Sequence, residues 1–216
     1  DETPGAAPST AESTTTSTIP EFVPTPIAWQ PCEDDLECAE VAVPVDYGQP
    51  AGPTLVLSVQ RAPASGQRIG AVFVNPGGPG GATADFVPYL KDNLPAPITE
   101  QFDLVGVEWR GTAASDFSCG VALPELYAPD STIEDQADAA ALIDVSRRYA
   151  DGCQAGAGEL LAHIGTMDAA RDLDIVRAAM GDEQISFLGI SYGSLLGQIY
   201  AQQFPTRVRA MVIDGI

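Results

Sequence analysis

The stretch Gly189-Ile-Ser-Tyr-Gly193 constrains this chain more than any other, because it fits the pattern G-x-S-x-G between a strand-like run and a helix-like run. Residues 184–190 are rich in β-forming side chains, and residues 195–204 favour a helix. Glycines two residues either side of the serine let a strand turn sharply into a helix without Cβ clashes, which presents the serine in strained backbone geometry. Ser191 is therefore the candidate nucleophile, and the alternative is a plain Gly/Ser turn with a buried hydroxyl group.

A second glycine-rich stretch supplies the other half of an acyl-transfer site. Residues 71–74 are typical of a strand buried on both faces, and they lead directly into Asn75-Pro-Gly-Gly-Pro-Gly-Gly81. Phosphate-binding patterns do not fit, since G-x-G-x-x-G needs a glycine at position 83 and the P-loop lysine is missing. An oxyanion hole needs one N–H from such a loop and one from the residue after the nucleophile. The expected donors are Gly78, with Gly77 as alternate, and Tyr192; the alternative is a tight turn.

The rest of the chain alternates strand-like and helix-like runs, which is the pattern of an α/β sheet with parallel strands. The expected strands are residues 38–45, 54–60, 71–74, 102–108, 184–190 and 207–213. The expected helices are residues 82–92, 133–156, 166–180 and 195–204. We expect the first two strands to form a hairpin and Thr166 to cap the third helix.

Composition divides the chain and excludes some partners. Residues 1–26 are dominated by Thr, Ser, Pro, Ala and Glu, so we expect a disordered N-terminal segment before a folded domain at 27–216. A formal net charge of −20 repels nucleic acid and anionic membrane surfaces. No apolar run reaches the ~18 residues of a membrane span. No basic-then-apolar leader opens the chain, so if the protein is exported we expect its signal peptide to have been removed already.

Four cysteines favour disulfide bonds over a metal site. They include no C-x-x-C pair and the chain has one histidine, so zinc ligation lacks its usual spacing. Three pairings are possible, and the sequence-local one joins Cys32 to Cys38 and Cys119 to Cys153. Disulfides imply an oxidising compartment, so we expect a secreted or cell-envelope protein. We expect neither a metal nor a cofactor.

Together these motifs resemble the α/β-hydrolase superfamily, and more narrowly the secreted actinobacterial tripeptidyl aminopeptidase group, which is related to proline iminopeptidases. The likeness runs from about Trp29 to the last residue. The motifs that carry it are V-P-V-D-Y at 43–47, V-N-P-G-G-P-G-G at 74–81, W-R-G at 109–111, Cys119 with Cys153, T-x-D-A-A-R-D-L-D at 166–174 and G-I-S-Y-G-S at 189–194. The resemblance implies a serine hydrolase that removes short peptides, tripeptides in this group, from free N-termini. It implies Ser191 as nucleophile and the N–H groups of Gly78 and Tyr192 as oxyanion hole.

The chain departs from the family pattern around the glycine loop. Glu108 stands where Asp is usual, Ala82 stands where Ser is common, and Ala113 and Ala114 interrupt a G-x-G-x-S run. Glu108 and Arg110 either orient the glycine loop by hydrogen bonding or form an exposed ion pair.

The base and the acid of a catalytic triad are missing from the expected places. In this superfamily the order is Ser, then Asp or Glu, then His, but only 25 residues follow Ser191 and none is His. His163 and Asp214 are secondary candidates for base and acid. An apolar final strand would also be left as an exposed edge. We therefore expect the N-terminal part of an α/β-hydrolase core sheet, about six strands, with the last strands, lid, Asp and His on a partner chain or a continuation.

Three functions stay open from the sequence. The first is a secreted exopeptidase that acts on peptide substrates, and the second is an esterase or lipase with the same strand-to-helix turn. The third is a catalytically silent binding module of the hydrolase fold, which the absent base motivates.

Overall fold

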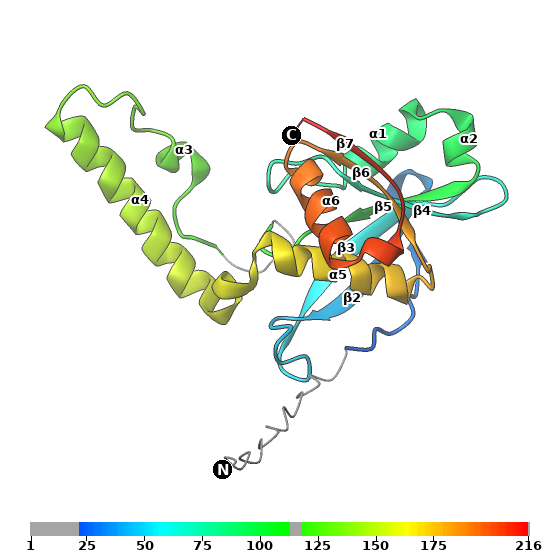
Figure 1. Cartoon of the computed structure of the whole chain (residues 1–216). Coiled ribbons are helices and arrows are strands. Elements are labelled where there is room, and N and C mark those ends of the chain that lie inside the picture. The colour runs from blue at the N-terminus through cyan, green and yellow to red at the C-terminus, as the bar shows by residue number, and fades with distance from the viewer. Residues whose placement is uncertain (1–21, 113–117, 216) are drawn as a thin grey trace, which may run out of the picture.

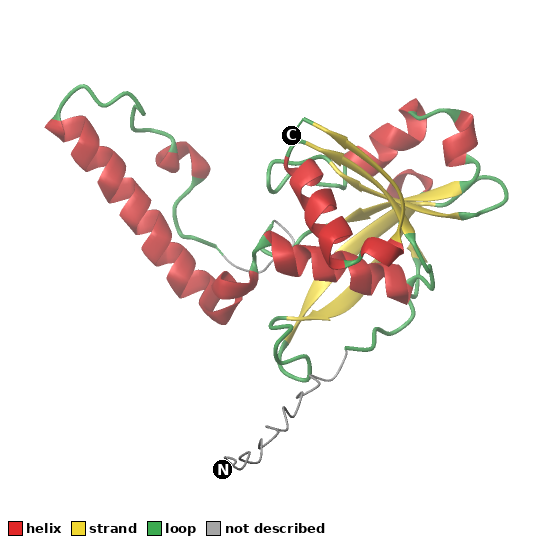
Figure 2. Ribbon diagram, viewed as in Figure 1, coloured by secondary structure: helices red, strands yellow, loops and turns green. Residues whose placement is uncertain are grey.

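The computed structural model describes residues 22–112 and 118–215, so the expected disordered segment lies mostly outside the described part of the chain, as do Ala113 and Ala114. A sheet with helices packed against it forms the body, and a helical arm extends away from it (Figures 1 and 2). The strands are β1 (Gln30–Pro31), β2 (Glu37–Pro44), β3 (Thr54–Ala62), β4 (Gly70–Asn75), β5 (Phe102–Val107), β6 (Ile185–Ile190) and β7 (Val208–Asp214). The α-helices are α1 (Phe86–Asn93), α2 (Ala96–Thr99), α3 (Leu123–Leu126), α4 (Gln136–Ala157), α5 (Thr166–Ala179) and α6 (Tyr192–Gln203), and the 3-10 turns are η1 (Glu33–Asp35), η2 (Gly158–His163) and η3 (Pro205–Arg207).

The sheet brings the two sequence motifs to one edge. Its strand order is β1-β2-β3-β5-β4-β6-β7; the pairs from β1 to β5 are antiparallel and the pairs from β5 to β7 are parallel. At the centre, Val74 of β4 lies between Gly106 of β5 and Leu188 of β6. Because parallel strands end at the same edge, the loops that follow β4, β5 and β6 meet there.

The expected strands are present, and the hairpin of β2 and β3 is confirmed. The mixed sheet differs from the parallel one that the alternation predicted, because its first strands are joined by a hairpin. Helix α1 begins at Phe86, four residues later than expected, since the amides of Thr83 and Ala84 are bonded to the Glu108 carboxylate. Thr166 does not cap its helix: it is the first residue of α5, after Gly165.

Apolar side chains fill both faces of the sheet. On one face, α5 and α6 pack through Leu173, Val176 and Leu196 against strand residues such as Phe73 and Val105. On the other face, α1 packs through Val87 and Leu90 against Val74 and Leu104. The alternation along β4 and β5 therefore places successive side chains in different layers, as expected for strands buried on both sides.

The arm of α3 and α4 is nearly without a core of its own. Helix α4 has 22 residues, and Val145 is its one buried residue. The disulfide bond Cys119–Cys153 ties the start of the arm to the last turns of α4. With Cys32–Cys38 as the other bridge, the sequence-local pairing is confirmed. Four large apolar side chains of the arm are exposed, namely Leu123, Tyr127, Ile133 and Ile143.

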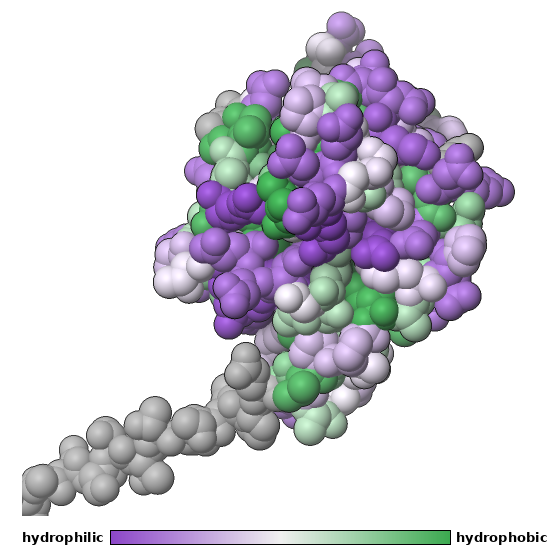
Figure 3. All heavy atoms as spheres, turned by 90° about the vertical axis from the view of Figure 1, so that its right-hand side faces the viewer, coloured by the Kyte–Doolittle hydropathy of each residue, from purple (hydrophilic) through white to green (hydrophobic). Residues whose placement is uncertain are grey.

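Hydrophilic residues cover most of the face shown in Figure 3, where hydrophobic residues appear in small scattered groups. This agrees with an excess of carboxylates spread over a solvated surface. Among the helices that the structure describes, none combines the length and the apolar character that a membrane span needs.

Candidate active site

Ser191 occupies a strained turn between β6 and α6. Its backbone angles are φ 53° and ψ −122°, and Ser191 and Asp35 are the two non-glycine residues with positive φ in the described part of the chain. The residue is exposed at the N-terminus of α6, and its N–H donates to the carbonyl oxygen of Asp214, 2.7 Å away. Backbone strain of this kind costs of order 1–3 kcal/mol and persists where the surrounding structure enforces it. The strand-to-helix turn predicted from G-x-S-x-G is thus present.

The turn leaves no room for side chains at its two glycines. A Cβ atom on Gly189 would lie 2.3 Å from the carbonyl oxygen of Gly193. A Cβ atom on Gly193 would lie 2.7 Å from the carbonyl oxygen of Asn75. Both distances are far below van der Waals contact, so this geometry requires glycine at both positions.

The glycine loop after β4 lies directly against this turn. Gly77 has φ +95°, and a Cβ atom there would lie 2.5 Å from the carbonyl oxygen of Ile190, 2.9 Å from Cβ of Ser191 and 3.1 Å from the amide nitrogen of Tyr192. The backbone of the loop at Gly77 therefore packs directly against the turn that carries Ser191 and Tyr192.

Hydrogen bonding distinguishes the candidate donors. The N–H of Gly77 donates to Oδ1 of Asn75 at 2.8 Å, so it is already engaged. The amides of Gly78 and Tyr192 donate to no acceptor among residues 22–112 and 118–215. Gly78 is exposed, and Tyr192 is in the first turn of α6, where amides lack intrahelical partners and the helix dipole is positive. This arrangement favours Gly78 over Gly77 as the loop's donor.

Glu108 holds the far end of the glycine loop. Its Oε1 accepts hydrogen bonds from the N–H of Thr83 at 2.7 Å, the hydroxyl of Thr83 at 2.8 Å and the N–H of Ala84 at 3.0 Å. Of the two roles considered for Glu108, the geometry matches loop support and not an ion pair with Arg110.

Arg110 does neither of the things expected of it. It is buried, and its guanidinium forms a bidentate pair with Asp172 at 2.6 and 2.5 Å and donates to the carbonyl oxygens of Pro44, Val45 and His163. Asp172 is 62 residues away in the sequence, so local sequence patterns did not predict it as the partner of Arg110. Arg110 therefore joins β2 to α5, and the structure shows neither of the two roles considered for it, orientation of the glycine loop or an exposed ion pair with Glu108.

The pKa values around this pair follow from burial. Burial raises the pKa of Asp172 to about 6, and the hydrogen bonds and charge of Arg110 oppose that rise. For Arg110, burial would lower the pKa, but the hydrogen bonds and charge of Asp172 raise it overall. Burial and the neighbouring Asp172 carboxylate also raise the pKa of Tyr47, whose hydroxyl donates to Asp172 at 2.7 Å. At neutral pH the cluster thus holds an ionised pair with a protonated phenol.

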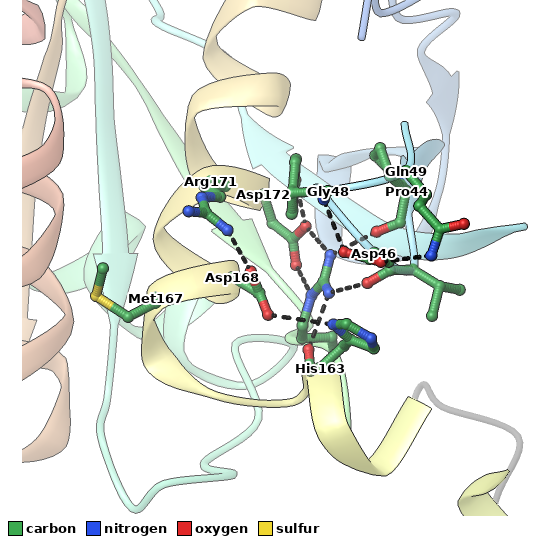
Figure 4. Close-up of polar contacts among 12 residues, drawn as sticks. Pro44, Asp46, Gly48, Gln49, His163, Met167, Asp168, Arg171 and Asp172 are labelled. Carbon is green, nitrogen blue, oxygen red and sulfur yellow. Dashed lines mark hydrogen bonds and ion pairs between the residues drawn. The ribbon is translucent and has the colours of Figure 1, made fainter. Parts of the chain in front are cut away.

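The side chains of the secondary candidates for base and acid form no hydrogen bond with the serine hydroxyl among the described residues. His163 faces Asp168 at the start of α5, with Nδ1 3.8 Å from the carboxylate (Figure 4). Asp214 is exposed at the end of β7, and its carbonyl oxygen accepts from the N–H of Ser191 and the hydroxyl of Ser194. Asp214 thus contributes its backbone to the turn. In the described part of the chain, His163 and the Ser191 hydroxyl form no hydrogen bond.

Two further side chains support the site and were missed from the sequence. Asn75 was visible as the last residue before the glycine loop, but only its Oδ1 contact shows its use. The hydroxyl of Thr166 lies 2.8 Å from that of Tyr192, which ties the start of α5 to the start of α6. No group of three or more His, Cys, Asp or Glu side chains among the described residues is arranged to hold a metal ion.

The strand order and the strained turn at Ser191 agree with one fold family: the chain belongs to the alpha/beta hydrolase fold family, whose model matches residues 70–216. It is 36% identical over 211 residues to the serine protease Hip1 of Mycobacterium tuberculosis, and the matched region covers 88% of this chain and 39% of Hip1. It is 38% identical over 204 residues to a tripeptidyl aminopeptidase of Streptomyces lividans, where the match covers 88% of this chain and 38% of the relative. It is 41% identical over 203 residues to carboxylesterase B of Mycobacterium tuberculosis, where the match covers 87% of this chain and 39% of the relative. The chain thus spans about 39% of the length of these curated relatives.

Proposed function

We propose that this chain carries the nucleophile and the oxyanion hole of a serine hydrolase whose base and acid come from a segment outside residues 1–216. The observation that carries the proposal is the exposed Ser191 at φ 53°, with the unengaged amides of Gly78 and Tyr192 on the two segments that meet beside it. The greater length of the curated relatives supports a further segment.

The reaction follows from these positions. The hydroxyl oxygen of Ser191 attacks the substrate carbonyl carbon while its proton passes to the histidine of the further segment. The carbonyl oxygen becomes an oxyanion, which the N–H groups of Gly78 and Tyr192 stabilise by hydrogen bonding. When the tetrahedral intermediate collapses, the histidine protonates the leaving amine and an acyl-enzyme remains. Water then gives a proton to the histidine as it attacks the acyl carbon, the bond between that carbon and the Ser191 oxygen breaks to release the carboxylic acid, and the histidine returns the proton to Ser191.

We assign the substrate as a peptide with a free N-terminus, from which short peptides are released. Support comes from the relatives named tripeptidyl aminopeptidase and serine protease. A second candidate is a carboxylic ester, which the relative named carboxylesterase B favours at 41% identity. Peptides and esters both form a tetrahedral intermediate with an oxyanion and differ in the leaving group, so the proposed nucleophile and oxyanion hole suit either substrate.

We assign the protein to an extracytoplasmic compartment. All four cysteines form disulfide bonds, which persist in oxidising surroundings. The partner in this proposal is the segment that delivers the acid, the histidine and the lid.

Covalent labelling tests the proposal. The native protein that contains this chain is treated with a fluorophosphonate probe, alongside its Ser191→Ala variant, and the labelled peptide is located by mass spectrometry. Labelling at Ser191 that the variant abolishes is expected; an unlabelled native protein would favour the binding module instead.

A comparison of hydrolysis rates on the same native protein distinguishes a peptide substrate from an ester substrate. Rates are compared for a tripeptide anilide with a free N-terminus, its N-blocked form and a short acyl ester. An exopeptidase cleaves the free anilide and discriminates against the blocked one. Preference for the ester, with no effect of the blocking group, would replace the peptidase assignment by the esterase.

A further inference from the structure

The glycine loop has few hydrogen bonds to hold it in place. Between β4 and α1, the amide of Gly77 bonds to Asn75 and the amide of Gly81 bonds to the carbonyl of Gly77. Further along, Thr83 and Ala84 bond to Glu108, and the carbonyl oxygen of Thr83 accepts from the side chain of Gln60. Glycine samples more backbone conformations than other residues, so ordering a glycine-rich loop costs more conformational entropy. Such a loop keeps one conformation only where contacts with other groups stabilise it. At its start, the side chain that does so is that of Asn75.

Asn75 is the last residue of β4 and is 1% exposed. Its Oδ1 accepts the N–H two residues further on, which is the Asx-turn geometry that asparagine favours. This bond engages the Gly77 amide, so the next amide along, that of Gly78, is the first one left without an acceptor among the described residues.

The same side chain also touches the segment that carries the second donor. A Cβ atom on Gly193 would lie 2.7 Å from the carbonyl oxygen of Asn75 and 2.8 Å from its Oδ1. Asn75 also pairs in register with Gly189, at the end of β6. The first turn of α6, with the amide of Tyr192, is therefore packed against the residue that fixes the glycine loop.

We propose that Asn75 is a positioning residue for the oxyanion hole: it fixes the Gly78 amide on the loop relative to the Tyr192 amide on α6. This inference rests on the proposed hydrolase function. Preorganised donors stabilise developing charge because they need not move as it forms, so loosening one of them acts on the transition state and not on substrate binding.

Three variants of the native protein test the role. Asn75→Ala removes the acceptor, Asn75→Ser keeps a shorter and weaker one, and Gly80→Ala changes a loop position where an added Cβ meets nothing within 4 Å. Fluorophosphonate titration first gives the fraction of active protein, so that loss of folded enzyme is separated from loss of rate.

For Asn75→Ala we expect kcat per titrated site to fall about 10- to 100-fold with KM nearly unchanged, because removing a donor outright costs about 10²–10³. The affinity for a peptide aldehyde, which mimics the tetrahedral intermediate, falls by a similar factor, and Asn75→Ser recovers part of both losses. A variant with fewer titratable sites but unchanged kcat and aldehyde affinity would show a purely structural role. If wild-type protein is not labelled at all, the hydrolase proposal fails first.

Discussion

Two glycines of the same loop share a backbone angle but not their surroundings. Gly77 and Gly80 both have φ +95°, so an alanine at either position bears a similar backbone strain, of order 1–3 kcal/mol. A Cβ atom on Gly80 meets nothing within 4 Å, whereas one on Gly77 lies 2.5 Å from the carbonyl oxygen of Ile190. Ordinary contact begins at 3.4 Å, so Gly77→Ala forces the loop and the turn apart by about 0.9 Å.

This displacement falls between the two proposed donors. A misplacement of about 1 Å at a catalytic centre costs about 100-fold in rate. We therefore expect Gly77→Ala to lower kcat/KM of the native protein about 100-fold, while Gly80→Ala stays within about threefold of wild type. The rate of fluorophosphonate labelling at Ser191 provides a second assay that does not depend on the substrate.

Urea denaturation of both variants provides the control for strain, since their unfolding free energies must be compared before their activities. The reasoning is refuted if Gly80→Ala loses as much activity as Gly77→Ala at similar stability. It is also refuted if Gly77→Ala is folded and fully active, because the loop would then not define the position of the donors.

Three further predictions concern the contacts around this site. Glu108→Ala leaves two loop amides without their acceptor, so we expect the free energy of unfolding in urea to fall by about 1–3 kcal/mol, and Glu108→Gln to lose less than half of that. Thr166→Val and Tyr192→Phe remove the two ends of one hydrogen bond, so a double-mutant cycle by denaturation should give a coupling of about 0.5–1.5 kcal/mol. Burial raises the pKa of Asp172 from 3.8 to about 6, so the stability that this group contributes is present below pH 4 and is lost as pH rises through 6. The free energy of unfolding of wild type minus that of Asp172→Asn should therefore fall between pH 4 and pH 6.

Each of these has an outcome that contradicts it. Equal losses for Glu108→Ala and Glu108→Gln would show that an uncharged side chain of the same shape restores none of the stability, so that the charge of Glu108 alone supports the loop. Additive effects of Thr166→Val and Tyr192→Phe would show that their hydroxyls do not interact in solution. A stability difference that rises between pH 4 and pH 6 would show that the attraction of Arg110 outweighs the burial of Asp172.

The sequence predicted those features that depend on neighbours along the chain. The apolar runs before the two glycine motifs give β4 and β6, and the glycine spacing around Ser191 gives the strained turn, since each of these depends on local backbone geometry. The sheet edge at which they meet follows from the alternation of strands and helices. These local patterns are why the candidate nucleophile was found from residues alone.

Contacts across the fold were predicted less well. Arg110 next to Trp109 looked available to the glycine loop, but its partner Asp172 is on a helix 62 residues away. Thr166 is of a residue type that often caps helices, yet its hydroxyl is hydrogen-bonded to the hydroxyl of Tyr192 on another helix. A polar side chain has several partners of similar energy, and the tertiary structure selects among them.

The bridge Cys119–Cys153 has one more consequence, which concerns limited proteolysis. It encloses α3, which has no buried residue, and most of α4, in which Val145 is the one buried residue. A protease that cuts one peptide bond between the two cysteines leaves both fragments covalently joined. Such a nicked molecule migrates at full size on a denaturing gel without thiol and separates into two bands once reductant is added.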